Sequence, residues 1–193
     1  MCLVVGMGPA LYYDVRSLLR IAQPMRSSDI EELHRIHWIV SVACGGLWVS
    51  GMALIYARTG FELSQFSPKL WSKVAVVTVL TANAFVLSTV MIPALSRFKG
   101  LRLVDLPVRQ LVPMSVCAGV SLSCWVLALA LGSSVTLKTA GWDLLLPVLA
   151  GGAVLCISGV VGMMFLLRAV VHGHIAGFLT RKDTAQLSLP FGR

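Results

Sequence analysis

Charged residues are scarce in this chain. Asp, Glu, Lys and Arg make up only 12% of its 193 residues, whereas hydrophobic residues make up 57%. Ordinary soluble domains carry about 25% charged residues. A soluble globule of this size could not bury so much apolar surface, because small proteins keep a large surface relative to their volume. The composition therefore excludes a soluble enzyme and a disordered chain, and it predicts an integral membrane protein.

Paired cysteine motifs are also missing. The cysteines lie inside apolar runs and none forms a Cys-x-x-Cys pair; they are Cys2, Cys44, Cys117, Cys124 and Cys156. This pattern excludes a zinc ribbon, thioredoxin-type chemistry and a disulfide scaffold. Cysteine commonly serves as a small buried hydrophobic residue, and we expect that role here.

Motifs of soluble active sites are absent as well. The sequence contains no P-loop, dinucleotide-binding fingerprint, Gly-x-Ser-x-Gly elbow or His-Glu-x-x-His zinc motif. Such a site would need a substantial domain outside the membrane, and the longest hydrophilic segment is only 14–35. We therefore expect no enzymatic activity.

Long apolar runs dominate what is present. Four stretches lack Asp, Glu, Lys and Arg and are long enough to cross a bilayer, which needs about 20 residues; they are 36–57, 74–96, 110–137 and 144–167. Segment 1–13 is shorter and resembles the second half of a span. Either its helix continues through Asp14 into the interface, or the true start lies upstream. The prediction is an all-α membrane bundle of five transmembrane helices, the first one short, with residues 1–175 as one domain.

The basic residues predict the orientation of this bundle. Twelve would lie on one side of the membrane, namely Arg16, Arg20, Arg26, Arg35, Arg97, Lys99, Arg102, Arg109, Arg168, Arg181, Lys182 and Arg193. Only Arg58, Lys69, Lys73 and Lys138 would lie on the other side. The side richer in Lys and Arg is normally cytoplasmic. We therefore expect the N-terminus outside, and the C-terminus with its tail, 176–193, in the cytoplasm.

Two local signals predict helix starts. Ser28 with Glu31 fits a capping box for a helix beginning near Asp29, and Ser67 followed by Pro68 fits an N-cap with a first-turn proline. Small-residue patterns predict where helices approach closely; these are Gly46-x-x-x-Ser50, Gly119-x-x-x-Ser123 and Ser158-x-x-x-Gly162.

Four histidines are the strongest candidates for a chemical role. His34 and His37 share one helix face, and His172 and His174 follow the last span on the same predicted side of the membrane. One interpretation is a metal or haem site where the second and fifth helices meet, since imidazole is a common ligand of both. The other is that these are polar residues at the headgroup level, and the lack of any histidine in the third helix favours it.

Ionisable residues are absent from the four long spans, whereas transport paths are commonly marked by them. Asp14 lies at the end of the first segment near Arg16, where we expect an interfacial ion pair. Asn83 is the most deeply placed strong hydrogen-bonding side chain, and we expect it to bond to a neighbouring helix. A small permease is one alternative function, in which Asn83 and Asp14 would be required for uptake.

Three segments resemble a known group of proteins: YYDVRSLLR at 12–20, LHRIHWIVSVACGGLWVSGMALIY at 33–56 and SPKLWSKVAVVTVLTANA at 67–84. They are similar to uncharacterised bacterial inner-membrane proteins with four or five helices, loosely related to copper-resistance D-type and b-type cytochrome-like membrane domains. The resemblance implies the bacterial inner membrane as location. It also implies haem b or copper as possible cofactors, with His34 or His37 as one ligand.

The net charge of +8 would suggest nucleic acid as a partner of a soluble protein. Here the basic residues lie in short loops between apolar runs, so we expect the lipid bilayer and other membrane subunits as partners instead. The sequence favours a non-enzymatic accessory or assembly subunit of a membrane complex. The alternative is a haem- or metal-binding protein for electron transfer or copper handling, with His34 and His37 as ligands and His172 or His174 as their partner.

Overall fold

The structure of the chain is a computed structural model. It describes residues 7–9, 11–12, 15–16, 23–24, 26–62, 64, 66–134 and 141–187, with side chains as far as residue 173. These residues form helices and connecting turns, and no β-strand occurs among them. Four of the helices are long and apolar enough to cross a membrane, which confirms the four long spans that the hydropathy predicts.

The long helices follow one another along the chain with short connections. They are α2 (Ser27–Thr59), a rod made of α3 (Pro68–Val86), a π-helical turn (Leu87–Met91) and α4 (Ile92–Ser96), then α5 (Val108–Ser133) and α6 (Trp142–Leu187). A short 3₁₀ turn, Leu103–Asp105, lies between α4 and α5. The helix α6 continues past residue 175, so the boundary proposed there stays a prediction. The predicted first span, 1–13, and Asp14 lie almost wholly outside the described residues.

The two predicted helix starts have different outcomes. Ser67 caps α3 as expected, with its hydroxyl accepting a hydrogen bond from the Leu70 N–H at 3.3 Å. The capping box of Ser28 with Glu31 is wrong, because α2 already begins at Ser27. At this end the Asp29 carboxylate accepts the Arg26 N–H at 2.8 Å. A negative group in the first turn also interacts favourably with the helix dipole.

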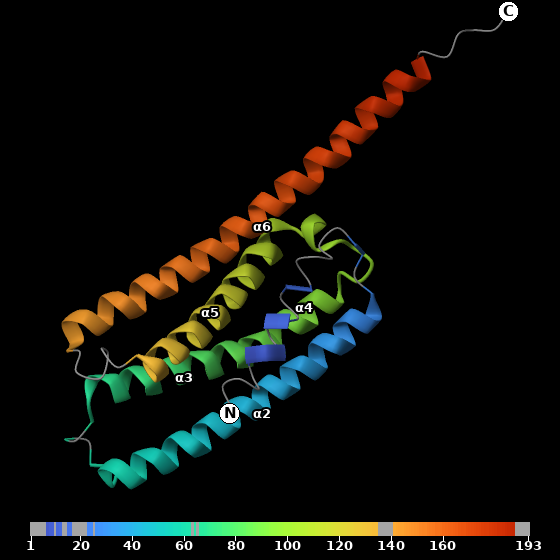
Figure 1. Cartoon of the computed structure of the whole chain (residues 1–193). Helices are drawn as coiled ribbons and strands as arrows, with labels where there is room; N and C mark the ends of the chain where they lie inside the picture. Colours follow the sequence, from blue (N-terminus) through green and yellow to red (C-terminus); the bar gives the residue numbers. More distant parts are fainter. Residues whose placement is uncertain are drawn as a thin grey trace, which may run out of the picture.

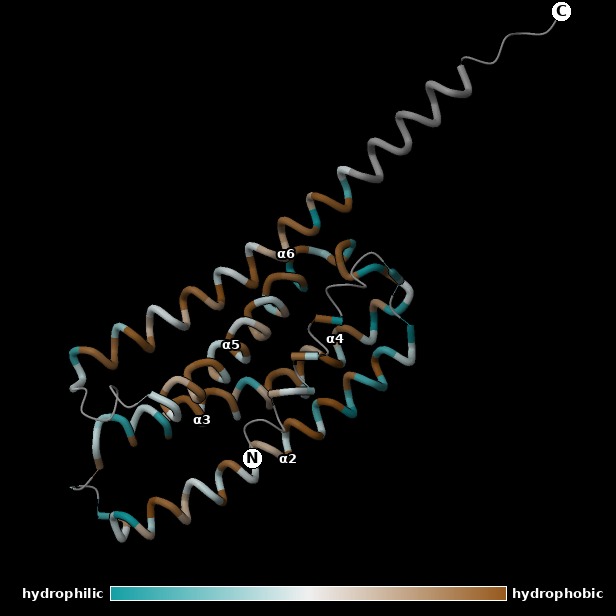
Figure 2. The backbone as a smooth tube through the Cα atoms, in the orientation of Figure 1, coloured by the Kyte–Doolittle hydropathy of each residue, from teal (hydrophilic) through white to brown (hydrophobic). Residues whose placement is uncertain are grey.

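The helices lie roughly side by side, with α3 and α5 between α2 and α6 (Figure 1). The helix α5 packs against α6 on one side and α3 on the other, while α2 packs against α3 and α4. Figure 2 shows hydrophobic residues along the middle of each helix and hydrophilic residues concentrated toward the ends of the bundle. This is the distribution that a bilayer requires, because apolar side chains meet lipid and polar ones meet water.

The closest helix contact joins α5 to α6. A Cβ placed on Gly119 would lie 2.7 Å from the Cα of Ile157, so only a glycine allows the two backbones to come this close. Ser123, one turn further along α5, is buried. Gly152 of α6 makes a looser contact, with the Leu127 side chain 3.1 Å from the position of a Cβ. The pattern Gly119-x-x-x-Ser123 therefore lies at a helix interface, as small residues do in membrane bundles.

A proline explains the π-helical turn between α3 and α4. Pro93 lacks an N–H, and in a regular α-helix its ring would collide with the carbonyl of Thr89. The turn just before it is wider, and the Ile92 N–H donates to the Leu87 carbonyl five residues back. This widening lets one helical rod continue to Ser96 without a break.

Substitution of Gly119 tests the α5–α6 contact. We expect Gly119→Ala to lower the free energy of unfolding by about 1–3 kcal/mol, the usual range for overpacking a close contact. Gly132→Ala is the matched control in the same helix, because nothing lies within 4 Å of a Cβ there. It should leave the midpoint of thermal unfolding in detergent unchanged or slightly higher. Equal midpoints for the two variants would contradict the packing of α5 against α6.

Candidate functional site

Polar side chains gather at the two ends of the bundle. One end contains the predicted histidines together with the start of α2, the 3₁₀ turn and the later part of α6. The other end contains the end of α2, the start of α3 and the end of α5. The contacts of these side chains decide which ligands each end of the bundle could bind.

His172 is held between its own helix and the 3₁₀ turn. Its Nδ1 atom donates to the carbonyl of Arg168 at 2.8 Å, and its Nε2 atom lies 3.3 Å from the Asp105 carboxylate. Both ring nitrogens thus face oxygen acceptors, so both can donate only when the ring carries two protons. When the ring carries one proton, Nδ1–H donates to the Arg168 carbonyl and the Nε2 lone pair faces the Asp105 carboxylate; when it carries two, Nε2–H can donate to that carboxylate. In both forms His172 lies against the 3₁₀ turn.

The same turn receives a second bond from α6. Arg168 donates from its guanidinium to the carbonyl of Leu106 at 3.1 Å, and Leu106 itself is fully buried. Arg168 and His172 are one helical turn apart and therefore project from the same face of α6. Together they attach the connection between α4 and α5 to α6, which is a structural role.

The histidines of α2 lie apart from this cluster. His34 donates from Nδ1 to the carbonyl of Ile30, 3.0 Å away in the preceding turn. Because α2 and α6 lie on opposite sides of α3 and α5 (Figure 1), the structure does not bring His34 and His37 together with His172. The His174 side chain is outside the described residues. Within the described part of the chain, no group of three or more His, Cys, Asp or Glu side chains could hold a metal ion.

Two other predicted polar residues can be compared with the structure. Asn83 donates from Nδ2 to the carbonyl of Cys117 at 3.0 Å and so links α3 to α5, the interhelical role expected of it. Arg16 forms an ion pair with Glu32 of α2, whereas its predicted partner Asp14 lies outside the described residues. Asn83 therefore needs no substrate to explain its position.

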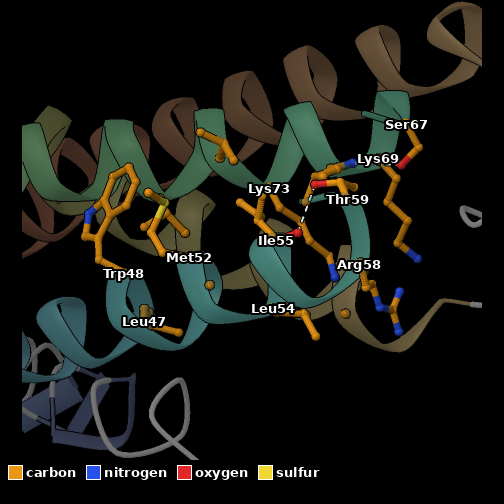
Figure 3. Close-up of a pocket in the computed structure, with 15 residues that line it drawn as sticks. Leu47, Trp48, Met52, Leu54, Ile55, Arg58, Thr59, Ser67, Lys69 and Lys73 are labelled. Atoms are coloured by element: carbon orange, nitrogen blue, oxygen red, sulfur yellow. Dashed lines mark hydrogen bonds between the residues drawn. The ribbon is translucent and has the colours of Figure 1, made fainter. Parts of the chain in front are cut away.

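The opposite end of the bundle contains a groove of about 680 Å³ between α2 and α3, completed by Gly132 of α5. This volume lies in the range of about 300–1,000 Å³ that is usual for ligand sites. Trp48 and Met52 lie near one end of the groove, and Arg58, Lys69 and Ser67 near the other (Figure 3). Most of the remaining lining is apolar; it includes Leu47, Leu54, Ile55, Leu70, Val74 and Val77.

Three cations line this groove, and no acidic residue is among the described residues that line it. Lys69 donates to the carbonyl of Ser134 at 3.0 Å. Arg58 and Lys73 form no hydrogen bond or ion pair with any residue that the structure describes. Glu62, in the connection between α2 and α3, has an interaction of its own. The groove therefore combines an apolar wall with a cationic end.

The sequence alone does not predict this groove. In the linear pattern Arg58, Lys69 and Lys73 indicate only orientation, because nothing there shows that they face one cavity. A partial signal exists, since Arg58 and Lys69 flank a short connection between two apolar runs. Trp48, whose indole N–H donates to the Thr81 hydroxyl at 3.0 Å, could not be placed in the groove from sequence.

Comparison with protein families, with characterised proteins and with solved structures finds no significant match for this chain. The resemblance to copper-resistance D-type and cytochrome-like domains therefore stays a prediction. Any function has to be inferred from the arrangement of the chain's own residues.

Replacement of Asn83 tests the link between α3 and α5. We expect Asn83→Leu to lower the free energy of unfolding by about 1 kcal/mol, the usual value of an interhelical hydrogen bond in a membrane. Thr78→Val on the same helix is the control, because among the described residues the Thr78 hydroxyl bonds to the Val74 carbonyl of its own helix alone. Chemical unfolding in mixed micelles measures both. A larger loss for Thr78→Val would contradict the role given to Asn83.

The separation of His34 and His37 from His172 predicts the outcome of a spectroscopic test. Protein prepared with haem, copper and zinc supplied should show no Soret band and no stoichiometric metal. The double variant His34→Ala/His37→Ala should give the same spectrum and metal content. A Soret band or a bound metal that is lost in the double variant would revive the redox or metal interpretation.

Proposed function

We propose that this chain is a non-enzymatic accessory subunit of a larger membrane complex, and that α6 is the helix that packs against its partner. The observation that supports this proposal is an exposed stripe on α6, made of three small residues and one leucine, that no other part of the described chain covers. We call the residues Gly151, Leu155, Ser158 and Gly162 the outer face of α6.

The helix α6 is the least buried of the four spans. Only 6% of its most apolar 18-residue window is buried within the chain, compared with 39% for the window in α5. Its contacts with α5 use one side of the helix, through residues such as Gly152 and Ile157. The opposite side is left for lipid or for another protein.

The outer face has the spacing of a helix-packing surface. Its members are separated by four, three and four residues, so they form one stripe along the helix. Leu155 is 73% exposed, and nothing lies within 4 Å of a Cβ placed on Gly151 or Gly162. Large apolar residues would serve equally well toward lipid, whereas small residues allow a second backbone to approach.

The contact at Gly119 supports this interpretation of the outer face. Gly119-x-x-x-Ser123 faces α6 inside the chain, and there the space over the glycine is filled by the Ile157 backbone. Ser158-x-x-x-Gly162 is the same kind of pattern, but no atom of the described chain lies within 4 Å of a Cβ placed on Gly162. The Ser158 hydroxyl donates to the Val154 carbonyl at 2.6 Å, so a partner helix would meet a surface with no unsatisfied polar group. The outer face is thus suited to close helix packing.

The location and orientation belong to the same proposal. Four spans that could cross a membrane, together with the unequal distribution of Lys and Arg between their ends, support an inner-membrane protein whose C-terminus is cytoplasmic. A fifth, short span formed by residues 1–13 would place the N-terminus outside. Apart from the end of α6, which extends beyond the bundle (Figure 1), little of the chain would then project from the membrane, which suits a subunit that contributes helices to an assembly.

The test of this proposal is whether a bulky residue on the outer face removes a partner. The chain is extracted from its native membrane into lipid nanodiscs, and co-purifying proteins are quantified by mass spectrometry. We expect a stoichiometric partner with the wild type and its loss in Gly162→Leu. Gly45→Leu on α2 is the matched control, because a Cβ there also meets nothing within 4 Å, and it should retain the partner.

Three results would contradict the proposal. The wild type alone in its nanodisc would show that no complex exists. Retention of the partner by Gly162→Leu would show that the outer face is not the interface. A particle containing only further copies of this chain would indicate a homo-oligomer in place of an accessory subunit.

A further inference from the structure

We propose that the groove between α2 and α3 binds a bilayer phospholipid that carries an anionic headgroup. The headgroup would lie against Arg58 and Lys73, and an acyl chain would lie along the apolar wall toward Trp48. This inference does not depend on the outer face of α6, which lies on another helix.

The charges of the groove favour an anion. Arg58 and Lys73 face it without a partner among the described residues, and Lys69 is a third cation in its lining. No described acidic side chain lines the groove to neutralise them. Arginine and lysine bind phosphate oxygens through charge-assisted hydrogen bonds.

The length of the groove fits one acyl chain. Its lining on α2 extends from Leu47 to Thr59, which is about 18 Å at 1.5 Å per residue. One leaflet of a bilayer contributes about 15 Å of hydrocarbon, half of its core of about 30 Å. The cationic end and the apolar wall thus match the depth over which a phospholipid extends from headgroup to chain end.

Aromatic residues place the cationic end of the groove at the membrane surface. Trp71 and Tyr56 are both exposed and lie on α3 and α2 close in sequence to the cations. Trp71 contacts Phe66 with ring centroids 5.4 Å apart, and Tyr56 contacts Phe61 with centroids 5.6 Å apart. Tryptophan and tyrosine prefer the level of the headgroups. Arg58 and Lys73 would therefore lie at the depth of the lipid phosphate groups.

Trp48 marks the other end of the groove and provides a probe. Its indole N–H donates to Thr81 at 3.0 Å, so the ring is fixed against α3 while it lines the groove. A soluble anion would leave this apolar end unfilled, whereas a lipid chain would cover it. A lipid with an anionic headgroup satisfies both ends of the groove together.

Quenching of Trp48 by brominated acyl chains tests the proposal. The full chain is placed in phosphatidylcholine nanodiscs that contain a fixed fraction of brominated lipid, with either a phosphatidylglycerol or a phosphatidylcholine headgroup. The part of the quenching that disappears in Trp48→Phe is assigned to the groove. We expect brominated phosphatidylglycerol to quench this part more strongly.

The variants locate the source of this preference. The preference for phosphatidylglycerol should fall by roughly 25-fold in Arg58→Gln/Lys73→Gln, because each cation near a membrane surface contributes about fivefold. The control Arg97→Gln/Lys99→Gln removes two cations at the opposite end of the bundle and should keep the preference. The variant Arg58→Lys/Lys73→Arg retains both charges and should also keep it, which guards against loss of folding as the cause.

The proposal is overturned if wild-type Trp48 is quenched equally by the two lipids, or if Arg58→Gln/Lys73→Gln keeps the preference. It is also overturned if glycerol phosphate, added at constant ionic strength, removes the preference. That result would show that the cations bind a soluble phosphate.

Discussion

Helices inside a lipid layer gain little from the hydrophobic effect, because lipid tails are as apolar as their side chains. They must be held by close packing and by a few polar contacts, and in this chain α5 takes part in both. At Gly119 it approaches the α6 backbone so closely that no Cβ would fit. On its other side, it accepts the hydrogen bond from Asn83 of α3 at the carbonyl of Cys117. The glycine contact therefore fixes α6 against α5, and the Asn83 amide fixes α3 against α5, while α2 packs on α3 and α4.

The central place of α5 also decides what the histidines can do. Because α3 and α5 separate α2 from α6, a ligand set shared between the outer helices is not formed. His34 donates within its own helix, while His172 joins its helix to the turn at Asp105. The imidazole of His34 therefore serves its own helix, and that of His172 attaches a loop to α6, although both lie near the same predicted membrane surface. The same separation gives α6 one free side, on which its remaining small residues lie.

Local features of this fold are readable from the sequence, and contacts between distant segments are not. Hydropathy is a property of consecutive residues, so the four spans could be predicted, as could the Ser67 cap before Pro68. The predicted start of α2 is wrong because the sequence contains two capping signals close together. Ser28 with Glu31 fits a capping box, but the structure uses the Asp29 carboxylate, which accepts the Arg26 N–H. The bonds from α6 to Asp105 and Leu106 cross more than sixty residues, and no local pattern indicates them. The groove could not be predicted for the same reason, since its lining comes from three helices.

The number of Lys and Arg residues and their position beside a cavity lead to different conclusions about the two ends of the bundle. The end expected in the cytoplasm has most of the basic residues. Arg16 is paired with Glu32 and Arg168 with the carbonyl of Leu106, whereas Arg35, Arg97 and Lys99 have no side-chain partner among the described residues and do not line the groove. The opposite end has few cations, and Arg58 and Lys73 face the groove without a described partner. Orientation in a membrane depends on the number of Lys and Arg residues, whereas recognition of an anion depends on charges that remain uncompensated beside a cavity. The end with fewer basic residues is therefore the better candidate for binding a lipid, because its uncompensated cations line a groove.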